Sequence, residues 1–184
     1  MTPLKMLDVG DDPYERGLIH GRTLAGEVLE NAETYLAMFK SNGMTRDEAL
    51  AEGGRWLPVI QESHPAYAEE MRGIASGADV PENLVGMLNA RYEIAFSLFG
   101  DEARSSGAFR EPEGCTSFGL MPEATADGAT IIGQNWDWLE GVQGRTVILR
   151  ISRSDGPDII SLNEAGIVGG KMGVNEHGIG LVEN

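Results

Sequence analysis

The chain changes its hydrophobic period near residue 105, and this change constrains the fold more than any other feature. Before residue 105, apolar side chains recur every three to four positions, as on the buried face of helices. After it, short apolar runs alternate with turn residues, as in strands. Helices followed by antiparallel strands predict an α+β domain, and 184 residues are enough for one hydrophobic core but few for two.

Turn and cap residues divide the first part of the chain into helices. Apolar residues recur at helical spacing from Pro13 onwards, and Asn42-Gly43 ends this segment. Thr45 and Glu48 have the spacing of a capping box, so a second helix is expected to begin there. Pro81 is suited to the first turn of a later helix. We therefore expect helices over 13–40, from Thr45 onwards, over 64–76 and over 81–99, and an exposed connection over 100–114.

Short apolar runs follow this connection. Their turns are marked by Asp127-Gly128, Asp155-Gly156-Pro157 and Asn175-Glu176-His177-Gly178. The runs between the turns have the length of strands. We expect antiparallel strands over 115–121, 130–134, 146–151, 158–162 and 178–182, arranged as a meander.

The charge balance limits the classes of partner. The chain has 29 acidic and 14 basic residues, for a net charge of -15. A negative field repels nucleic-acid phosphates, so we expect no nucleic-acid partner. The N-terminus lacks the apolar run of a signal peptide, and no apolar stretch is long enough to span a bilayer. We therefore expect a cytoplasmic protein without a membrane partner.

The Gly114-Cys115 junction is suited to a self-cleavage reaction. A lone cysteine is more often inert than catalytic, but Gly114 has no Cβ, so a thiol can approach its carbonyl at little steric cost. Attack would convert the peptide bond into a thioester, and hydrolysis would leave Cys115 as a new N-terminus. Its α-amine, with an ordinary pKa of about 8, could then accept the thiol proton, so that one residue supplies nucleophile and base.

Cys115 is the only cysteine in the chain. It therefore has no partner for an intrachain disulfide, and a cysteine-based zinc site cannot form. We expect neither a metal nor a cofactor.

Several ordered motifs resemble one known family. The chain resembles the acyl-coenzyme A:6-aminopenicillanic acid acyltransferase family and the wider bile-salt-hydrolase-like branch of N-terminal-nucleophile (Ntn) hydrolases. Each motif is weak alone, but together they cover nearly the whole chain. They are 16–21 (RGLIHG), 89–93 (NARYE), 114–118 (GCTSF), Asp127-Gly128, 133–138 (GQNWDW), 164–167 (EAGI), 173–178 (GVNEHG) and Asn184.

The resemblance implies a role for three catalytic residues. Cys115 corresponds to the nucleophile, and Gly114 precedes the bond that is cleaved. Asp137 matches an aspartate that holds the amine of the nucleophile, which a carboxylate stabilises in its charged form. Asn184 matches an asparagine near the oxyanion hole. Supporting positions are implied for Ser117, Gln134 and Asn135.

The same resemblance implies a fold and a substrate class. An Ntn hydrolase is an αββα sandwich, and family members are considerably longer than this chain. We therefore expect residues 1–114 to form a mainly helical pro-segment, 115–184 to form the first part of the sandwich, and the C-terminal half to be absent. The implied substrate is a small acyl-amide or acyl-thioester. A homo-oligomer or a second chain could supply the missing half.

The remaining motifs bear on the branch of the family, on structural roles and on an alternative function. Gln134 stands where the bile-salt-hydrolase branch carries arginine, which favours the acyltransferase-like branch. Asn89 and Glu93 could line a pocket or form buried hydrogen bonds, and Trp136 and Trp138 are expected mainly in the core. Residues 166–172 resemble a phosphate loop only superficially, since the spacing differs from the motif. A non-catalytic fragment or binding module that keeps the scaffold without processing itself remains the alternative.

Overall fold

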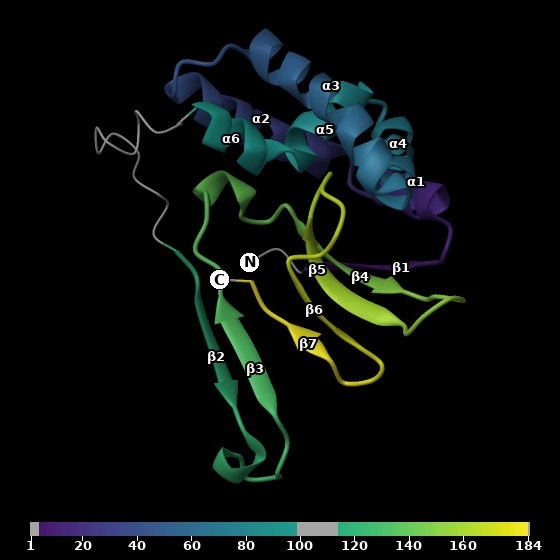
Figure 1. Ribbon diagram of the computed structural model, residues 1–184, viewed down its shortest axis with the longest axis vertical. Coiled ribbons are helices and arrows are strands. Elements are labelled where there is room, and N and C mark those ends of the chain that lie inside the picture. The colour runs from purple at the N-terminus through teal and green to yellow at the C-terminus, as the bar shows by residue number, and fades with distance from the viewer. Residues whose placement is uncertain (1–3, 99–113, 184) are drawn as a thin grey trace.

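Helices and strands form separate layers, which confirms the α+β class (Figure 1). The computed structural model describes residues 4–98 and 114–183. The helices lie on one side of a five-stranded sheet, and a two-stranded hairpin extends away from them. The connection expected over 100–114 lies outside the described residues except for Gly114, and Asn184 lies outside them as well.

Six helices make up the described helical layer. The capping box is confirmed, because Thr45 Oγ1 accepts from the Glu48 N–H at 3.3 Å and a Glu48 carboxylate oxygen accepts from the Thr45 N–H at 2.8 Å. The helices are α1 (Pro13–Thr23), α2 (Ala25–Ser41), α3 (Arg46–Ser63), α4 (Pro65–Ala78), α5 (Glu82–Asn89) and α6 (Arg91–Leu98).

Two segments that were expected as single helices are each divided. Leu24 interrupts 13–40 with φ −121° and ψ 24°, and Ala90 interrupts 81–99 with φ −98° and ψ 16°. Both side chains are almost fully buried, so core packing compensates for the lost helical geometry. Pro81 is the N-cap of α5 and not part of its first turn. Local periodicity does not reveal such breaks, because the packing that favours them comes from distant residues.

The strands form two sheets where a single meander was expected. β2 and β3 pair only with each other, as an antiparallel hairpin. The larger sheet has the order β1-β4-β5-β6-β7, antiparallel except that β1 pairs parallel with β4. The strands are β1 (Lys5–Val9), β2 (Thr116–Leu120), β3 (Ile131–Asn135), β4 (Thr146–Ile151), β5 (Ile159–Glu164), β6 (Met172–Asn175) and β7 (Gly180–Leu181).

Two strands were missed by the sequence pattern. β1 precedes the helices, so the expectation of a helical segment followed only by antiparallel strands is wrong. Its Leu7 lies opposite Leu149, far along the chain, and no local turn signal announces that pairing. β6 is only four residues long, and the strand expected over 178–182 is reduced to Gly180–Leu181.

The two faces of the larger sheet differ in what covers them. Val9, Val147 and Leu149 are buried in the core beneath the helices. On the opposite face, Ile160 and Val174 lie side by side and are each 45% exposed. The hairpin approaches this outer face, since a Cβ on Gly180 would overlap the side chain of Ile132. The described elements thus stack as helices, sheet and hairpin.

Glycines allow α1 and α4 to pack with their backbones in contact. A Cβ on Gly17 would overlap the carbonyl of Glu70, and one on Gly21 would overlap the carbonyl of Ile74. From the other side, a Cβ on Gly73 would overlap the carbonyl of Tyr14. Residues four apart share one helix face, so glycines at this spacing create a flat strip on each helix.

This contact predicts that Gly17→Ala destabilises the protein while Gly26→Ala does not. The added methyl at 17 forces α1 and α4 apart and should cost at least about 1–3 kcal/mol. Gly26 lies in α2 with nothing within 4 Å of its Cβ position, so alanine there should be neutral or stabilising by up to about 1 kcal/mol. Urea denaturation measures both variants, and equal stability of the two would contradict the packing argument.

Candidate active site

Gly114 and Cys115 lie immediately before β2, at the end of the hairpin where β3 finishes. Thr116 pairs with Asn135 and Ser117 with Gln134, so these candidates share one end of the hairpin. Gly114 is exposed and Cys115 is partly exposed. Within the described residues, no atom lies within 4 Å of the Cβ position of Gly114. The junction is therefore open on the side where a side chain would project.

The side chain of Gln134 joins this end of the hairpin to the end of the described chain. Its Oε1 accepts from the Glu183 N–H at 2.9 Å, and its Nε2 donates to the Glu183 carbonyl. The Gln134 amide thus uses its acceptor and one of its donors on the backbone of a single residue. It also places the sequence neighbour of Asn184 beside the residue that pairs with Ser117.

Asp137 follows β3 by two residues, in a segment without regular secondary structure. Its side chain is exposed, whereas Trp136 and Trp138 on either side of it are partly buried and pack against the core. This confirms core packing as the role of the two tryptophans. Within the described residues no hydrogen bond joins Asp137 to Cys115. The amine that Asp137 was predicted to hold is still part of a peptide bond in this chain.

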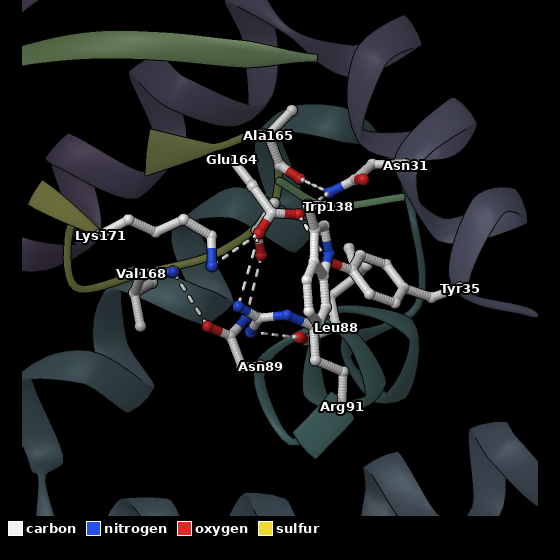
Figure 2. Close-up of polar contacts among 11 residues, drawn as sticks. Asn31, Tyr35, Leu88, Asn89, Arg91, Trp138, Glu164, Ala165, Val168 and Lys171 are labelled. Atoms are coloured by element: carbon white, nitrogen blue, oxygen red, sulfur yellow. Dashed lines mark hydrogen bonds and ion pairs between the residues drawn. The ribbon is translucent and has the colours of Figure 1, made fainter. Parts of the chain in front are cut away.

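A buried carboxylate, that of Glu164, lies at the centre of a polar cluster (Figure 2). Glu164 Oε1 is 3.0 Å from Lys171 Nζ and 3.4 Å from an Arg91 nitrogen. Its Oε2 accepts from the Tyr35 hydroxyl at 2.8 Å and from Asn31 Nδ2 at 3.4 Å. The side chain of Glu164 has 0% exposure and those of the two cations have 7%. Four donors therefore replace the water that this carboxylate has lost.

Aromatic rings surround the cations of this cluster. The Arg91 guanidinium lies 4.3 Å from the centre of the Tyr92 ring, and Lys171 Nζ lies 4.8 Å from that of Trp136. Trp138 donates its indole N–H to the Tyr35 hydroxyl at 2.8 Å. Burial and the charge of Glu164 raise the pKa of Tyr35, so its hydroxyl stays protonated and donates to the carboxylate.

The turn after Glu164 is held by side chains from the helices. Asn89 Nδ2 donates to the Gly166 carbonyl and Asn89 Oδ1 accepts from the Val168 N–H, both at 2.9 Å. His20 Nε2 accepts from the Gly166 N–H at 3.0 Å. The structural alternative for Asn89 is therefore confirmed, while Glu93 is exposed. Burial lowers the pKa of His20 to about 4, so the imidazole is neutral.

Sequence reasoning did not identify the Glu164 cluster. Residues 89–93 and 164–167 were interpreted as motifs of the resemblance, with Asn89 and Glu93 also as pocket or hydrogen-bonding candidates. Lys171 was considered as part of a segment that resembles a phosphate loop only superficially. The available signal was that three charged residues, Arg91, Glu164 and Lys171, stand inside apolar or glycine-rich stretches. Charged residues in such positions are paired when they are buried, but their partners cannot be assigned without the fold.

Two clefts lie near these elements. One of about 770 Å³ opens between the starts of α1 and α4 and the helix-facing side of β5 and β6, and the buried pair Arg16–Glu70 lines it. Another of about 540 Å³ separates the hairpin from the outer face of the sheet, with Gln134 among its lining residues. Of the described candidate residues, Gln134 lines this second cleft, whereas Cys115 and Asp137 do not.

The described residues contain neither a cluster of metal-ligating side chains nor a membrane-spanning helix. Among residues 4–98 and 114–183, no group of three or more histidine, cysteine or acidic side chains is placed to hold a metal ion. In that same part of the chain, none of the helices has the length and apolar character required to cross a bilayer.

Together these features define an α+β protein with a Gly-Cys junction at the start of a hairpin and a buried ion cluster among the helices and the larger sheet. No protein-family model matches the chain. It is 32% identical over 173 residues to the 40 kDa form of acyl-coenzyme A:6-aminopenicillanic-acid-acyltransferase from Emericella nidulans, covering 94% of this chain and 44% of that protein. The predicted resemblance is confirmed: along nearly its whole length the chain is similar to an acyl-coenzyme A:6-aminopenicillanic-acid-acyltransferase.

A second relative is archaeal. The chain is 26% identical over 190 residues to an uncharacterized protein of Archaeoglobus fulgidus, covering 96% of this chain and 32% of that protein. The chain thus spans less than half the length of each of these two curated relatives.

The neutral, buried His20 predicts a loss of stability in mild acid. Its pKa is about 4 in the folded protein against 6.5 for an exposed histidine, so between these values the unfolded chain binds a proton that the folded chain does not. The free energy of unfolding should therefore fall as the pH is lowered through this window, by about 2 kcal/mol between pH 7 and pH 5 from this group alone.

Urea titrations at the two pH values measure this loss. His20→Gln keeps an acceptor for the Gly166 N–H but does not titrate, so its stability should fall by less. His177→Gln is the matched control, because His177 is exposed. If His20→Gln shows the same pH dependence as the wild type, His20 is not the titrating group.

Proposed function

We propose that this chain belongs to a self-processing amide hydrolase or acyltransferase that uses Cys115 as an N-terminal nucleophile. The observation that carries the proposal is the open, partly exposed Gly114-Cys115 junction at the start of β2, in a chain related to an acyltransferase along 94% of its length. The proposed substrate is a small acyl-amide or acyl-thioester.

The proposed maturation is an intramolecular cleavage. The Cys115 thiolate attacks the Gly114 carbonyl carbon, the bond from that carbon to the Cys115 nitrogen breaks, and the nitrogen takes up the thiol proton. Water then hydrolyses the thioester, which leaves a carboxylate on Gly114 and a free thiol and amine on Cys115. Glycine at 114 favours this attack because no side chain shields the carbonyl.

In the mature site the Cys115 amine would act as the base. It accepts the thiol proton while Sγ attacks the substrate carbonyl, and the departing amine of the substrate takes that proton as the acyl-thioester forms. Water or a second amine then accepts the acyl group. We propose that Asp137 stabilises the protonated amine and that Asn184 donates an N–H to the developing oxyanion. The contact between Gln134 and Glu183 supports this role, because it anchors the residue next to Asn184.

Ser117, Gln134 and Asn135 complete the proposed site as supporting residues. Gln134 and Ser117 pair across the hairpin, and Asn135 lies opposite Thr116, one residue from the nucleophile. We infer that they maintain the hairpin end at which Cys115 is presented. In that scheme, residues 1–114 are the pro-segment and 115–184 begin the catalytic sandwich.

Processing and turnover test the nucleophile and its aspartate. Mass spectrometry of the full-length protein should show cleavage between Gly114 and Cys115, and Cys115→Ala should remain one chain. Asp137→Asn should lower turnover of an acyl-amide by about 100-fold, since it removes the charge that positions the amine and stabilises it once it has accepted the thiol proton. Asp127→Asn, at the opposite end of the same hairpin, is the matched control and should retain wild-type rates.

The alternative is an inert fragment or binding module that retains the scaffold. It is favoured by one observation, that Asp137 is exposed and, within the described residues, makes no hydrogen bond to Cys115. A full-length protein that stays uncleaved and turns over no acyl-amide would establish this alternative and exclude the enzyme.

We further propose that the described layers belong to an αββα sandwich. The hairpin facing the outer side of the sheet supports this, because two β layers then lie next to one another with helices on one side. The exposed Ile160 and Val174 support it as well, since a contiguous apolar sheet face is normally covered. The covering segment would come from a longer form of the chain, a second chain or a second copy.

An uncovered apolar face predicts that residues 1–184 alone associate and bind a hydrophobic dye. Ile160→Lys combined with Val174→Lys should reduce both effects, because charges replace the exposed apolar patch. Val59→Lys is the control, since Val59 is 50% exposed but lies on α3. Dye fluorescence and sedimentation measure the change. A monomer that binds no dye would contradict a missing cover.

A further inference from the structure

Lys171 is a buried cation that the proposed chemistry does not use. It lies in the stretch between β5 and β6, where its N–H donates to the Leu162 carbonyl at 2.9 Å. Its ammonium is 3.0 Å from Glu164 and its side chain is 7% exposed. Arg91 already lies against the same carboxylate. Glu164 therefore has two cations for one negative charge, and the second cation requires another explanation.

The second feature of Lys171 is its contact with the segment that carries Asp137. Its Nζ lies 4.8 Å from the ring centre of Trp136 and 5.9 Å from that of Trp138. Ring faces attract a cation at these distances, and more strongly when water is excluded. Trp136 and Trp138 are the immediate neighbours of Asp137. One ammonium thus contacts both residues that flank the proposed aspartate.

The tryptophans are held from other directions as well. Trp138 donates to Tyr35 at 2.8 Å and meets the Tyr92 ring edge-on, with 5.5 Å between ring centres. The Trp136 ring instead contacts a cation, the ammonium of Lys171. Trp136 and Trp138 are partly buried against the core while Asp137 between them is exposed, so the two inward tryptophans direct Asp137 outward.

We propose that Lys171 is a positioning residue for Asp137. The ion pair with Glu164 fixes the position of the Lys171 ammonium. The ammonium in turn holds the rings of Trp136 and Trp138, and the two rings set the orientation of the Asp137 carboxylate between them. This inference rests on the proposed function, because Asp137 matters only if it holds the Cys115 amine. A displacement of about 1 Å at such a group can cost about 100-fold in rate.

The test compares Lys171→Met, which removes the charge but keeps the stem, with Lys171→Arg, which keeps the charge. In Lys171→Met, Glu164 retains Arg91, Tyr35 and Asn31 as partners, so the fold should persist. The matched control is Lys40→Met, which removes an exposed lysine of α2. All variants are made in the full-length protein, and circular dichroism checks that each is folded.

The decisive readout is the pH dependence of Cys115 alkylation by iodoacetamide in the processed protein. Asp137 raises the pKa of the amine, and a displaced Asp137 raises it less. The pH profile of Cys115 alkylation should therefore shift in the same direction in Lys171→Met as in Asp137→Asn. The profiles of Lys171→Arg and Lys40→Met should match that of the wild type. Turnover of an acyl p-nitroanilide should fall by about tenfold to 100-fold in Lys171→Met. Adding Lys171→Met to Asp137→Asn should cause no further shift or loss.

If the effects of Lys171→Met and Asp137→Asn on alkylation or turnover are additive, the inference is wrong, because Lys171 then acts elsewhere. The inference is also wrong if the pH profile of Cys115 alkylation does not shift in Lys171→Met. If the wild type is not cleaved at all, the proposed function fails. The claim that Lys171 positions the two tryptophans is then tested separately, by fluorine NMR of 5-fluorotryptophan at positions 136 and 138. If these resonances are unchanged in Lys171→Met, the positioning role of Lys171 is wrong. If Lys171→Met does not fold, Trp136→Leu removes the same contact and carries the same expected shift.

Discussion

The carboxylate of Glu164 lies between the helices and the sheet, completely removed from water. An isolated buried carboxylate is unfavourable by several kcal/mol even after the protein relaxes, so its partners are obligatory. They come from α2, from the start of α6 and from the stretch between β5 and β6. The position of the helical layer on the sheet therefore depends on satisfying this one group.

The same network extends to the candidate site. Tyr35 donates to Glu164 and accepts from Trp138, so a chain of two hydrogen bonds links the carboxylate to the segment that carries Asp137. The partners of Glu164 also lie on both sides of the Gly114-Cys115 junction, with Asn31, Tyr35 and Arg91 before it and Lys171 after it. Breaking that one peptide bond would leave all these contacts in place.

The hairpin gives the proposed nucleophile a different environment. The turn of the hairpin points away from the helical layer (Figure 1), and Cys115, which precedes β2 at the other end, is partly exposed while the ion cluster is closed. Gln134 connects that end to Glu183 at the far end of the described chain.

The local chemistry of the sequence determined the helical first part, the capping box at Thr45, the turns at Gly128 and Gly178 and the Gly114-Cys115 junction, and the predicted resemblance was confirmed by the comparison. These features depend on residues close together in the chain. The roles of Cys115, Asp137 and Asn184 remain predictions.

Only the tertiary structure decided the parallel pairing of β1, the breaks at Leu24 and Ala90, the separate hairpin, and the meeting of Arg91, Glu164 and Lys171. Each of these is set by burial against residues distant in sequence, and a local pattern carries no information about which distant surface will cover it.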